Sequence, residues 1–284
     1  MGASLMYTWK SRFLTRGEVW FDGDRDNTRL VDCIRYQQRS QPVPGARSKL
    51  FDTYFIDLSQ PAEQLRANLN TDTAYKIRRA RERDKIVCEC CDARDPDVLG
   101  RFEEMYNAFA ATKGLPALDR PRINAMTNAG VLDLSVAKDS NGRALVYHAN
   151  YRNRTRAREL FLPSLFRQLS DSAARNMIGR ANRYLTWSDV LRYKHDGLRL
   201  FDFGGWYSGN DPAMLKINDF KKGFGGQVLR EYECEQILTL KGWLAFKVAR
   251  LLKQAKRLSG APKKLAETSP PAQANEPSTI PSSI

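Results

Sequence analysis

Residues 199–226 read RLFDFGGWYSGNDPAMLKINDFKKGFGG, and this stretch decides the fold. An apolar run at 200–203 ends in the pair Gly204-Gly205, and a second pair, Gly225-Gly226, follows Lys221. Glycine occurs where the backbone bends sharply or where a ligand comes close to it. We therefore predict a strand over 200–203, a pocket enclosed between the two glycine pairs, and Lys221 as the cation that faces this pocket.

The same stretch resembles the signature of the Fem family, the GNAT-fold acyl and aminoacyl transferases of bacterial envelope biosynthesis. The family pattern is a strand ending Asp-hydrophobe-Gly-Gly, a variable loop, and then Ile-Asn-x-Phe-Lys-x-x-Phe-Gly-Gly. Residues 202–205 (DFGG) and 217–226 (INDFKKGFGG) match this pattern. The resemblance implies a mixed α/β GNAT fold that transfers an acyl group directly from a thioester or ester to an amine or hydroxyl.

The resemblance also implies roles for single residues. In family members the lysine of the matching Phe-Lys pair lies where donor and acceptor meet, so Lys221 is the candidate for stabilising the charged tetrahedral intermediate. A solvated surface lysine is the alternative. The candidate substrate-binding residues are Phe220, as an aromatic platform, and Gly204, Gly205, Trp206, Gly225 and Gly226.

Two further side chains are candidates for catalysis. His148 lies in the strand predicted over 143–151, at a level where GNAT enzymes often place a general base, and Val146 and Asn150 share its face. Asp202 ends the apolar strand and is placed to orient an acceptor amine. The alternatives are a hydrogen-bonded packing histidine and a carboxylate that braces a loop.

The candidate donor site is the segment 176–181, which reads NMIGRA. Coenzyme A enzymes of the GNAT fold usually carry Gln/Arg-x-x-Gly-x-Gly/Ala, whose backbone amides hold a pyrophosphate at a helix N-terminus. The segment matches this pattern in part, and we predict that Gly179 begins a helix. The candidate phosphate-binding residues are Asn176, Gly179, Arg180, Ala181 and Arg183. An acyl-CoA is therefore the predicted donor, and aminoacyl-tRNA is the less favoured alternative.

Composition and charge restrict the partners. The chain has 284 residues and a net charge of +14, and such basic surfaces attract nucleic acid, coenzyme A, nucleotide sugars or anionic lipid. The length allows one large domain or two small ones. The cysteines are Cys33, Cys88, Cys90, Cys91 and Cys234. Cys88, Cys90 and Cys91 lie close together in the sequence, but no histidine lies near them to complete a zinc site. We therefore predict reduced thiols and no metal.

Strand and helix patterns suggest the domain organisation. Three strands predicted over 132–137, 143–151 and 157–162, followed by helix, strand, helix and strand, give the GNAT order. We predict an N-terminal extension (1–58), a GNAT-like domain (59–240), a basic amphipathic helix (241–258) and a disordered tail (259–284).

The segment 241–258 has an apolar side and six lysines or arginines with no acid among them. This pattern suits an anionic membrane surface, and packing against the domain is the alternative. The chain lacks an apolar run long enough to cross a membrane and a recognisable secretory signal. We therefore expect a cytoplasmic protein, peripheral at the inner face of the membrane.

The sequence thus predicts a transferase that moves an acyl group from a CoA thioester to an amine or hydroxyl of an envelope precursor. The predicted acceptor is a peptidoglycan stem peptide, a polysaccharide sugar or a lipid-linked intermediate. One alternative is the same chemistry with aminoacyl-tRNA as donor. The other is a non-catalytic protein that binds nucleic acid or another anionic ligand.

Overall fold

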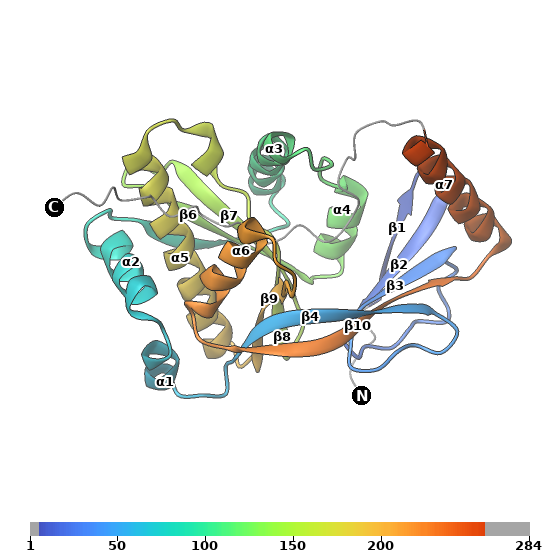
Figure 1. Cartoon of the computed structure of the whole chain (residues 1–284), viewed down its shortest axis with the longest axis horizontal. Helices are drawn as coiled ribbons and strands as arrows, with labels where there is room; N and C mark the ends of the chain where they lie inside the picture. The colour runs from blue at the N-terminus through green and yellow to red at the C-terminus, as the bar shows by residue number, and fades with distance from the viewer. Residues whose placement is uncertain (1–5, 259–284) are drawn as a thin grey trace.

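A computed structural model describes residues 6–258, and the tail predicted over 259–284 lies outside the described residues. A single ten-stranded sheet has the order β1-β2-β3-β10-β4-β9-β8-β7-β6-β5 (Figure 1). The strands are β1 (Tyr7–Ser11), β2 (Leu14–Trp20), β3 (Cys33–Arg39), β4 (Arg47–Asp57), β5 (Val87–Cys91), β6 (Leu132–Lys138), β7 (Ala144–Arg152), β8 (Arg156–Phe161), β9 (Leu200–Gly205) and β10 (Gln227–Ile237). The helices are α1 (Ala62–Ala67), α2 (Thr71–Glu82), α3 (Pro96–Lys113), α4 (Arg120–Asn128), η1 (Leu165–Gln168), α5 (Ser172–His195), α6 (Pro212–Lys222) and α7 (Leu240–Leu258).

The sheet splits between β8 and β9. These two strands are parallel neighbours and pair from Arg156↔Leu200 to Arg158↔Asp202. Beyond that point β8 continues to Phe161 and β9 to Gly205 without pairing to each other. Each strand keeps its partner on the other side, β7 and β4 respectively, so the gap in the hydrogen-bond ladder is local. This divergence positions the candidate site.

The segment predicted as an N-terminal extension belongs to the same sheet. It supplies β1 to β4, and β4 lies between β10 and β9. The pairing of β4 with β10 runs from Phe55↔Gln227 to Arg47↔Glu235, and these two long strands connect the β1–β3 side of the molecule to the β5–β9 side (Figure 1). The strands from 1–58 and from 59–240 therefore form one continuous sheet.

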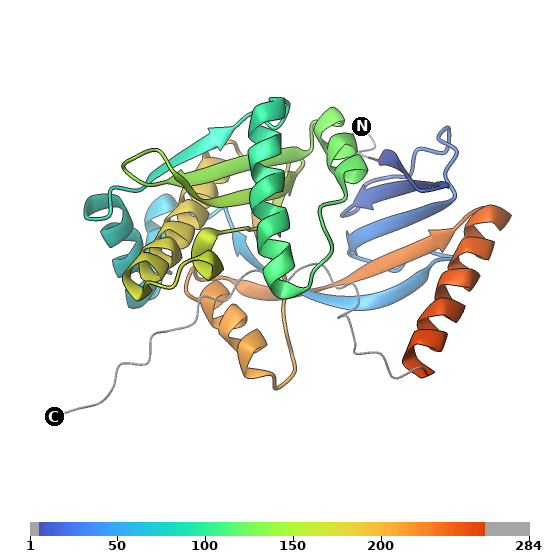
Figure 2. The same ribbon diagram turned by 90° about the horizontal axis from the view of Figure 1, so that it is seen from above.

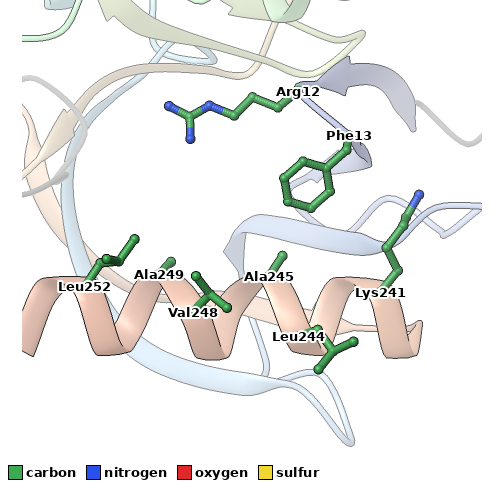
Figure 3. A pocket seen from close by; sticks show the side chains of 8 residues that line it. All are labelled: Arg12, Phe13, Lys241, Leu244, Ala245, Val248, Ala249 and Leu252. Carbon is green, nitrogen blue, oxygen red and sulfur yellow. The ribbon is translucent and has the colours of Figure 1, made fainter.

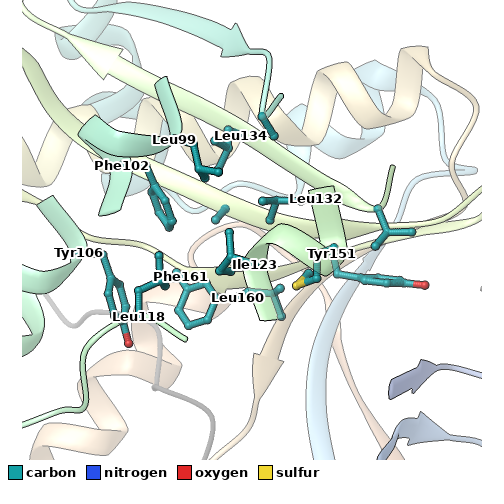
Figure 4. Packing of buried hydrophobic residues seen from close by; sticks show 14 of the residues in the cluster. Leu99, Phe102, Tyr106, Leu118, Ile123, Leu132, Leu134, Tyr151, Leu160 and Phe161 are labelled. Atoms are coloured by element: carbon teal, nitrogen blue, oxygen red, sulfur yellow. The ribbon is translucent and has the colours of Figure 1, made fainter. Parts of the chain in front are cut away.

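Helices cover both faces of the β5–β8 half of the sheet. Alternate side chains of β7 point to opposite faces, so Tyr147 and Ala149 join the core under α3 and α4 while Val146 joins the core under α5. Figure 2 shows α3 lying across β6 and β7, and Figure 4 shows Leu99, Phe102 and Ile123 packed among side chains of β6 to β8. Complete burial of each such side chain contributes about 1.5–3 kcal/mol.

The predicted start of a helix at Gly179 is wrong, because α5 begins about two turns earlier. The side chain of Asp171 caps α5 by accepting hydrogen bonds from the amides of Ala173 (3.3 Å) and Ala174 (2.7 Å). Gly179 therefore lies within the helix, where its amide takes part in helical hydrogen bonding. Within residues 6–258, no helix combines the length and the apolar character needed to cross a bilayer.

Candidate functional site

Lys221 is buried at the end of α6, with 1% of its surface exposed. The side chain of Asp211 caps this helix, and Ile217 and Phe220 are buried with Lys221, so the apolar side of α6 carries the ammonium group inward. The Nζ of Lys221 donates hydrogen bonds to the carbonyl oxygen of Gly204 (3.1 Å) and to that of the next residue, Gly205. Burial lowers the pKa of Lys221 to about 8. Lys221 is therefore not a solvated surface lysine, while its catalytic role stays a prediction.

Three of the four glycines in the two pairs are required for close packing, while a Cβ at Gly205 would meet only a ring of β4 at 3.7 Å. Gly204 has φ +76°, and a Cβ there would lie 2.4 Å from the guanidinium of Arg158. Gly225 has φ +70°, and a Cβ would lie 2.6 Å from Asn68. At Gly226 the nearest atom would be a backbone carbonyl oxygen of β4 at 2.4 Å. These three glycines pack against other segments of the same chain. They do not line the single pocket that was predicted between the glycine pairs.

Replacing Gly204 by alanine is expected to lower the free energy of unfolding by about 1–3 kcal/mol, because the new Cβ meets both an unfavourable φ and the buried guanidinium of Arg158. Chemical denaturation measures the change. Gly100→Ala is the control, since Gly100 lies within α3 with no neighbouring atom within 4 Å. The control should raise stability by up to about 1 kcal/mol. Equal stability of the two variants would contradict this account.

The aromatic residues of the stretch have different surroundings. Phe220 is buried, with its ring centroid 5.3 Å from that of Phe224 and the guanidinium carbon of Arg183 4.9 Å from its own centroid. Trp206 is half-buried and stacks on Tyr54 with ring centroids 5.0 Å apart. Phe220 therefore fixes α6 in the core, and Trp206 is the more accessible of the two candidate substrate-binding aromatics.

Asp202 is buried and has many hydrogen-bond donors around it. Arg156 forms an ion pair with it, Gln38 donates a hydrogen bond of 2.7 Å, Thr53 donates through its hydroxyl, and the amide of Gly204 donates at 2.6 Å. Burial alone would raise the pKa of Asp202, but Arg156 and a second nearby arginine hold it below its ordinary value. This environment supports the bracing alternative, because the carboxylate already holds the turn at Gly204 in place.

His148 is also buried and has acceptors at both ring nitrogens. Nδ1 lies 2.9 Å from a carboxylate oxygen of Asp189, and Nε2 lies 2.8 Å from the side-chain oxygen of Asn182. Burial alone would lower the pKa of His148, but Asp189 raises it above its ordinary value. Two acceptors favour a ring protonated at both nitrogens, which has no lone pair for a base. The geometry supports the packing alternative over the predicted general base.

Glu159 is a buried acid that the pattern of the chain did not reveal. It is the first residue of β8 beyond the pairing with β9, and 1% of its surface is exposed. Neither carboxylate oxygen has a hydrogen-bond partner among the described residues. Burial raises the pKa of Glu159 to about 7, against the smaller lowering effects of His148 and Lys221. A buried carboxylate without partners is unfavourable for folding alone, which marks it as a functional candidate.

Other polar groups near Glu159 also lack partners among the described residues. Asn150 pairs with Glu159 across β7 and β8, and its side-chain amide is buried with neither atom hydrogen-bonded. The hydroxyl of Thr186 in α5 is likewise buried and unbonded. Thr186 lies four residues from Asn182 and three from Asp189, so it shares the helix face that these two present to β7. The α5-facing side of the strand divergence therefore contains several buried polar groups with unused hydrogen-bonding capacity.

Glu159 and Lys221 have complementary acid–base properties. Each appears among the charges that shift the pKa of the other, which places them in one electrostatic environment. A carboxylate with pKa about 7 accepts a proton near neutrality, and an ammonium with pKa about 8 still carries its charge there. Among the described side chains, no group of three or more histidines, cysteines and acids is arranged to hold a metal ion.

The structure does not gather the candidate phosphate-binding residues into a cradle. Gly179 and Ala181 are buried inside α5, and Asn176 is exposed. Arg180 forms an ion pair with Asp84 at 2.5 Å, and Arg183 lies over an aromatic ring of α6. The amides at the start of α5 are capped by a carboxylate, which opposes an anion there. The predicted pyrophosphate site therefore lacks the geometry that its pattern requires.

No protein-family model and no curated protein sequence matches the chain. The structure of FemX resembles it with a TM-score of 0.60 and 12% identity over 86% of this chain and 85% of that one. The chain has the FemX-like GNAT fold. The C-terminal domain of a putative lysylphosphatidylglycerol synthetase from Agrobacterium fabrum has a TM-score of 0.52 and 14% identity, over 88% and 89% of the two chains. L-PGS from Bacillus licheniformis has a TM-score of 0.51 and 12% identity, over 87% and 85%.

The FemX-like fold confirms the α/β GNAT class expected from residues 199–226. Identities of 12–14% establish the fold alone. The order expected after residue 130 is also confirmed, since β6, β7 and β8 are antiparallel neighbours followed by α5, β9, α6 and β10. In this FemX-like fold, β9 carries residues 202–205 of the sequence signature, α6 and the turn after it carry residues 217–226, and β8 carries Glu159.

Proposed function

We propose that the protein is a transferase that moves an acyl or aminoacyl group onto an amine or hydroxyl of a cell-envelope precursor. The observation that carries this proposal is the burial of Glu159 and Lys221 in one environment where β8 and β9 separate. The FemX-like fold supports it, because a domain of a putative lysylphosphatidylglycerol synthetase has a similar fold. Direct transfer needs a base for the nucleophile and a cation for the oxyanion, and this pair supplies both.

Glu159 takes a proton from the incoming amine or hydroxyl as its nitrogen or oxygen forms a bond to the donor carbonyl carbon. The ammonium of Lys221 stabilises the oxyanion of the tetrahedral intermediate. Two of its three N–H groups donate to the carbonyls of Gly204 and Gly205, which leaves one for the substrate. When the intermediate collapses, the bond from carbon to the donor's oxygen or sulfur breaks, and Glu159 returns the proton to that leaving atom.

We propose an aminoacyl ester of tRNA as the donor, in place of the CoA thioester that was favoured from the sequence. The pattern at 176–181 was the sequence feature that favoured coenzyme A, and the cap of Asp171 and the ion pair of Arg180 leave no pyrophosphate cradle there. A net charge of +14 suits a polyanionic donor. One neighbour is named for a lipid that carries a lysyl group, which supports an aminoacyl group and an acceptor at the envelope.

The donor test uses the purified full chain. A mixture of charged tRNAs and a mixture of acyl-CoAs are each incubated with phosphatidylglycerol vesicles or with a nucleotide-linked peptidoglycan stem peptide, and mass spectrometry follows the acceptor. We expect a mass increase of one aminoacyl residue with charged tRNA. An increase with acyl-CoA alone would reassign the donor. No transfer from either, with RNA binding that falls steeply as salt rises, would identify a non-catalytic binder.

Replacing Lys221 by methionine is expected to lower kcat by about 10²–10³-fold, because the oxyanion loses its charged donor. The wild-type rate should also fall as pH rises above about 8, where the ammonium loses its proton, and the variant should lack this decline. Steady-state kinetics across pH measure both effects. Lys222→Met is the matched control, since the adjacent lysine has 58% of its side chain exposed. A similar loss in both variants would contradict the assignment.

A further inference from the structure

Helix α7 is attached to the rest of the molecule mainly through its first turn. Asp32, which follows the loop after β2, accepts a hydrogen bond from the hydroxyl of Thr239 (2.6 Å) and forms an ion pair with Lys241 (2.8 Å). Gly242 is buried there, and a Cβ at this position would lie 2.7 Å from the carbonyl oxygen of Asp32. From this anchor α7 extends along the β1–β3 side of the molecule (Figures 1 and 2).

The apolar side of α7 is uncovered. Large apolar side chains with 44–73% of their surface exposed are Leu240, Trp243, Leu244, Val248, Leu251 and Leu252. This exposure is inconsistent with the alternative that the helix buries its apolar side against the domain. Isolated exposed apolar residues are ordinary, but a continuous row at helical spacing marks a surface that binds something.

A turn from the other end of the chain faces this helix across a groove. Arg12 and Phe13 form the tight turn between β1 and β2, where Ser11 pairs with Leu14 and Arg12 has φ +57°. The ring of Phe13 is 64% exposed and points toward α7 (Figure 3). The groove has a volume of about 410 Å³ and is lined by Arg12, Phe13, Lys241, Leu244, Ala245, Val248, Ala249 and Leu252. Its walls are apolar, and its charged members are both cations.

We propose that the turn at Phe13 and the apolar side of α7 form one docking surface for an anionic lipid bilayer, whose acyl chains enter the groove. Charge complementarity selects this occupant, because residues 240–258 contain no acid. Arg12, Lys247 and Arg250 form no ion pair with any described side chain, and only the ammonium of Lys247 contacts a ring, that of Trp243 at 4.1 Å, so these cations can meet lipid phosphates. The surface is independent of the proposed transfer chemistry, and it extends the expected membrane helix by a second element from the N-terminal strands.

The test is co-sedimentation of the full chain with vesicles of phosphatidylglycerol and phosphatidylcholine, and with vesicles of phosphatidylcholine alone. We expect binding to the anionic vesicles, with a partition coefficient about tenfold lower for Phe13→Ser and for Leu244→Ser. Leu215→Ser is the matched control, because Leu215 is a 40% exposed leucine on α6. A blue shift of tryptophan fluorescence on binding, absent in Trp243→Phe, reports burial of α7.

Three results would overturn the proposal. An equal loss of vesicle binding in Leu244→Ser and Leu215→Ser would show that any exposed leucine contributes as much to this binding. Equal binding to both vesicle types would remove the role of charge. Absence of vesicle binding, together with a dimer that Leu244→Ser dissociates in analytical ultracentrifugation, would assign the surface to a second copy of the chain. Since none of these measurements uses transfer activity, failure here leaves the proposed reaction untouched.

Discussion

Replacing Glu159 by glutamine is expected to lower kcat by about 10²–10⁴-fold, because the variant keeps the size of the side chain but has no carboxylate to accept the proton of the acceptor. The wild-type rate should rise with pH through about 7, as Glu159 loses its proton. Together with the decline above about 8 from Lys221, the profile should be a narrow bell. In Glu159→Gln the rise of kcat with pH on the acidic side of the profile should be absent. A pH profile of kcat with saturating acceptor measures this difference.

Measuring the stability of Glu159→Gln distinguishes a loss of catalysis from a loss of folding. The folded pKa of Glu159 is raised to about 7 from an ordinary value of 4.5, so the folded state binds more protons than the unfolded state between these values. Glu159 therefore lowers stability as pH rises through this window, and the loss is complete above about 7. Glutamine removes the effect, so Glu159→Gln should be at least as stable as wild type above that pH. An inactive variant that is also unfolded there would not support the assignment.

The local patterns of the chain predicted individual elements of the fold but not the extent of the sheet, because residues 1–58 were expected as an extension and supply β1 to β4. The strand at 200–203 and the strands after residue 130 follow from the spacing of apolar residues, which local sequence carries. Gly179 was misplaced as a helix start because the capping signal lies at Asp171, outside the matched segment. The spacing of glycines also does not distinguish approach of a ligand from approach of another strand, and Gly226 lies against β4.

The candidate site depended on contacts between distant parts of the chain. His148 meets its partners in α5, at Asn182 and Asp189, only after β7 and the helix pack together. Glu159 lies in a strand that also contains two arginines, so its charge did not stand out in the local sequence. Its importance depends on where β8 stops pairing with β9, which no local pattern specifies. Lys221 was identifiable because the family signature includes it.

Arg156→Met is expected to lower the free energy of unfolding by about 3–5 kcal/mol, the largest stability effect among these variants. Arg156 lies between two buried carboxylates, with an ion pair to Asp202 and another of 2.6 Å to Glu231. Its loss leaves both acids without their shared cation and weakens the link between β8, β9 and β10. Urea denaturation measures the change. Arg230→Met is the matched control, because the ion pair of Arg230 with Asp52 is exposed and should contribute less than about 1 kcal/mol.

The pH dependence of this defect distinguishes lost charge pairing from lost packing. Without Arg156 the pKa of Asp202 and that of Glu231 should both rise, because the cation that favours their charged forms is gone. Protonation of these two acids then removes the unpaired buried charge in Arg156→Met. The difference in free energy of unfolding between the variant and wild type should therefore shrink as pH falls. A second change, Glu231→Gln, should restore part of the stability for the same reason. A deficit that is independent of pH and unaffected by Glu231→Gln would indicate that Arg156 acts through packing alone. Since Asp202 also holds the amide of Gly204, whose carbonyl binds Lys221, charge loss at Arg156 should lower transfer as well.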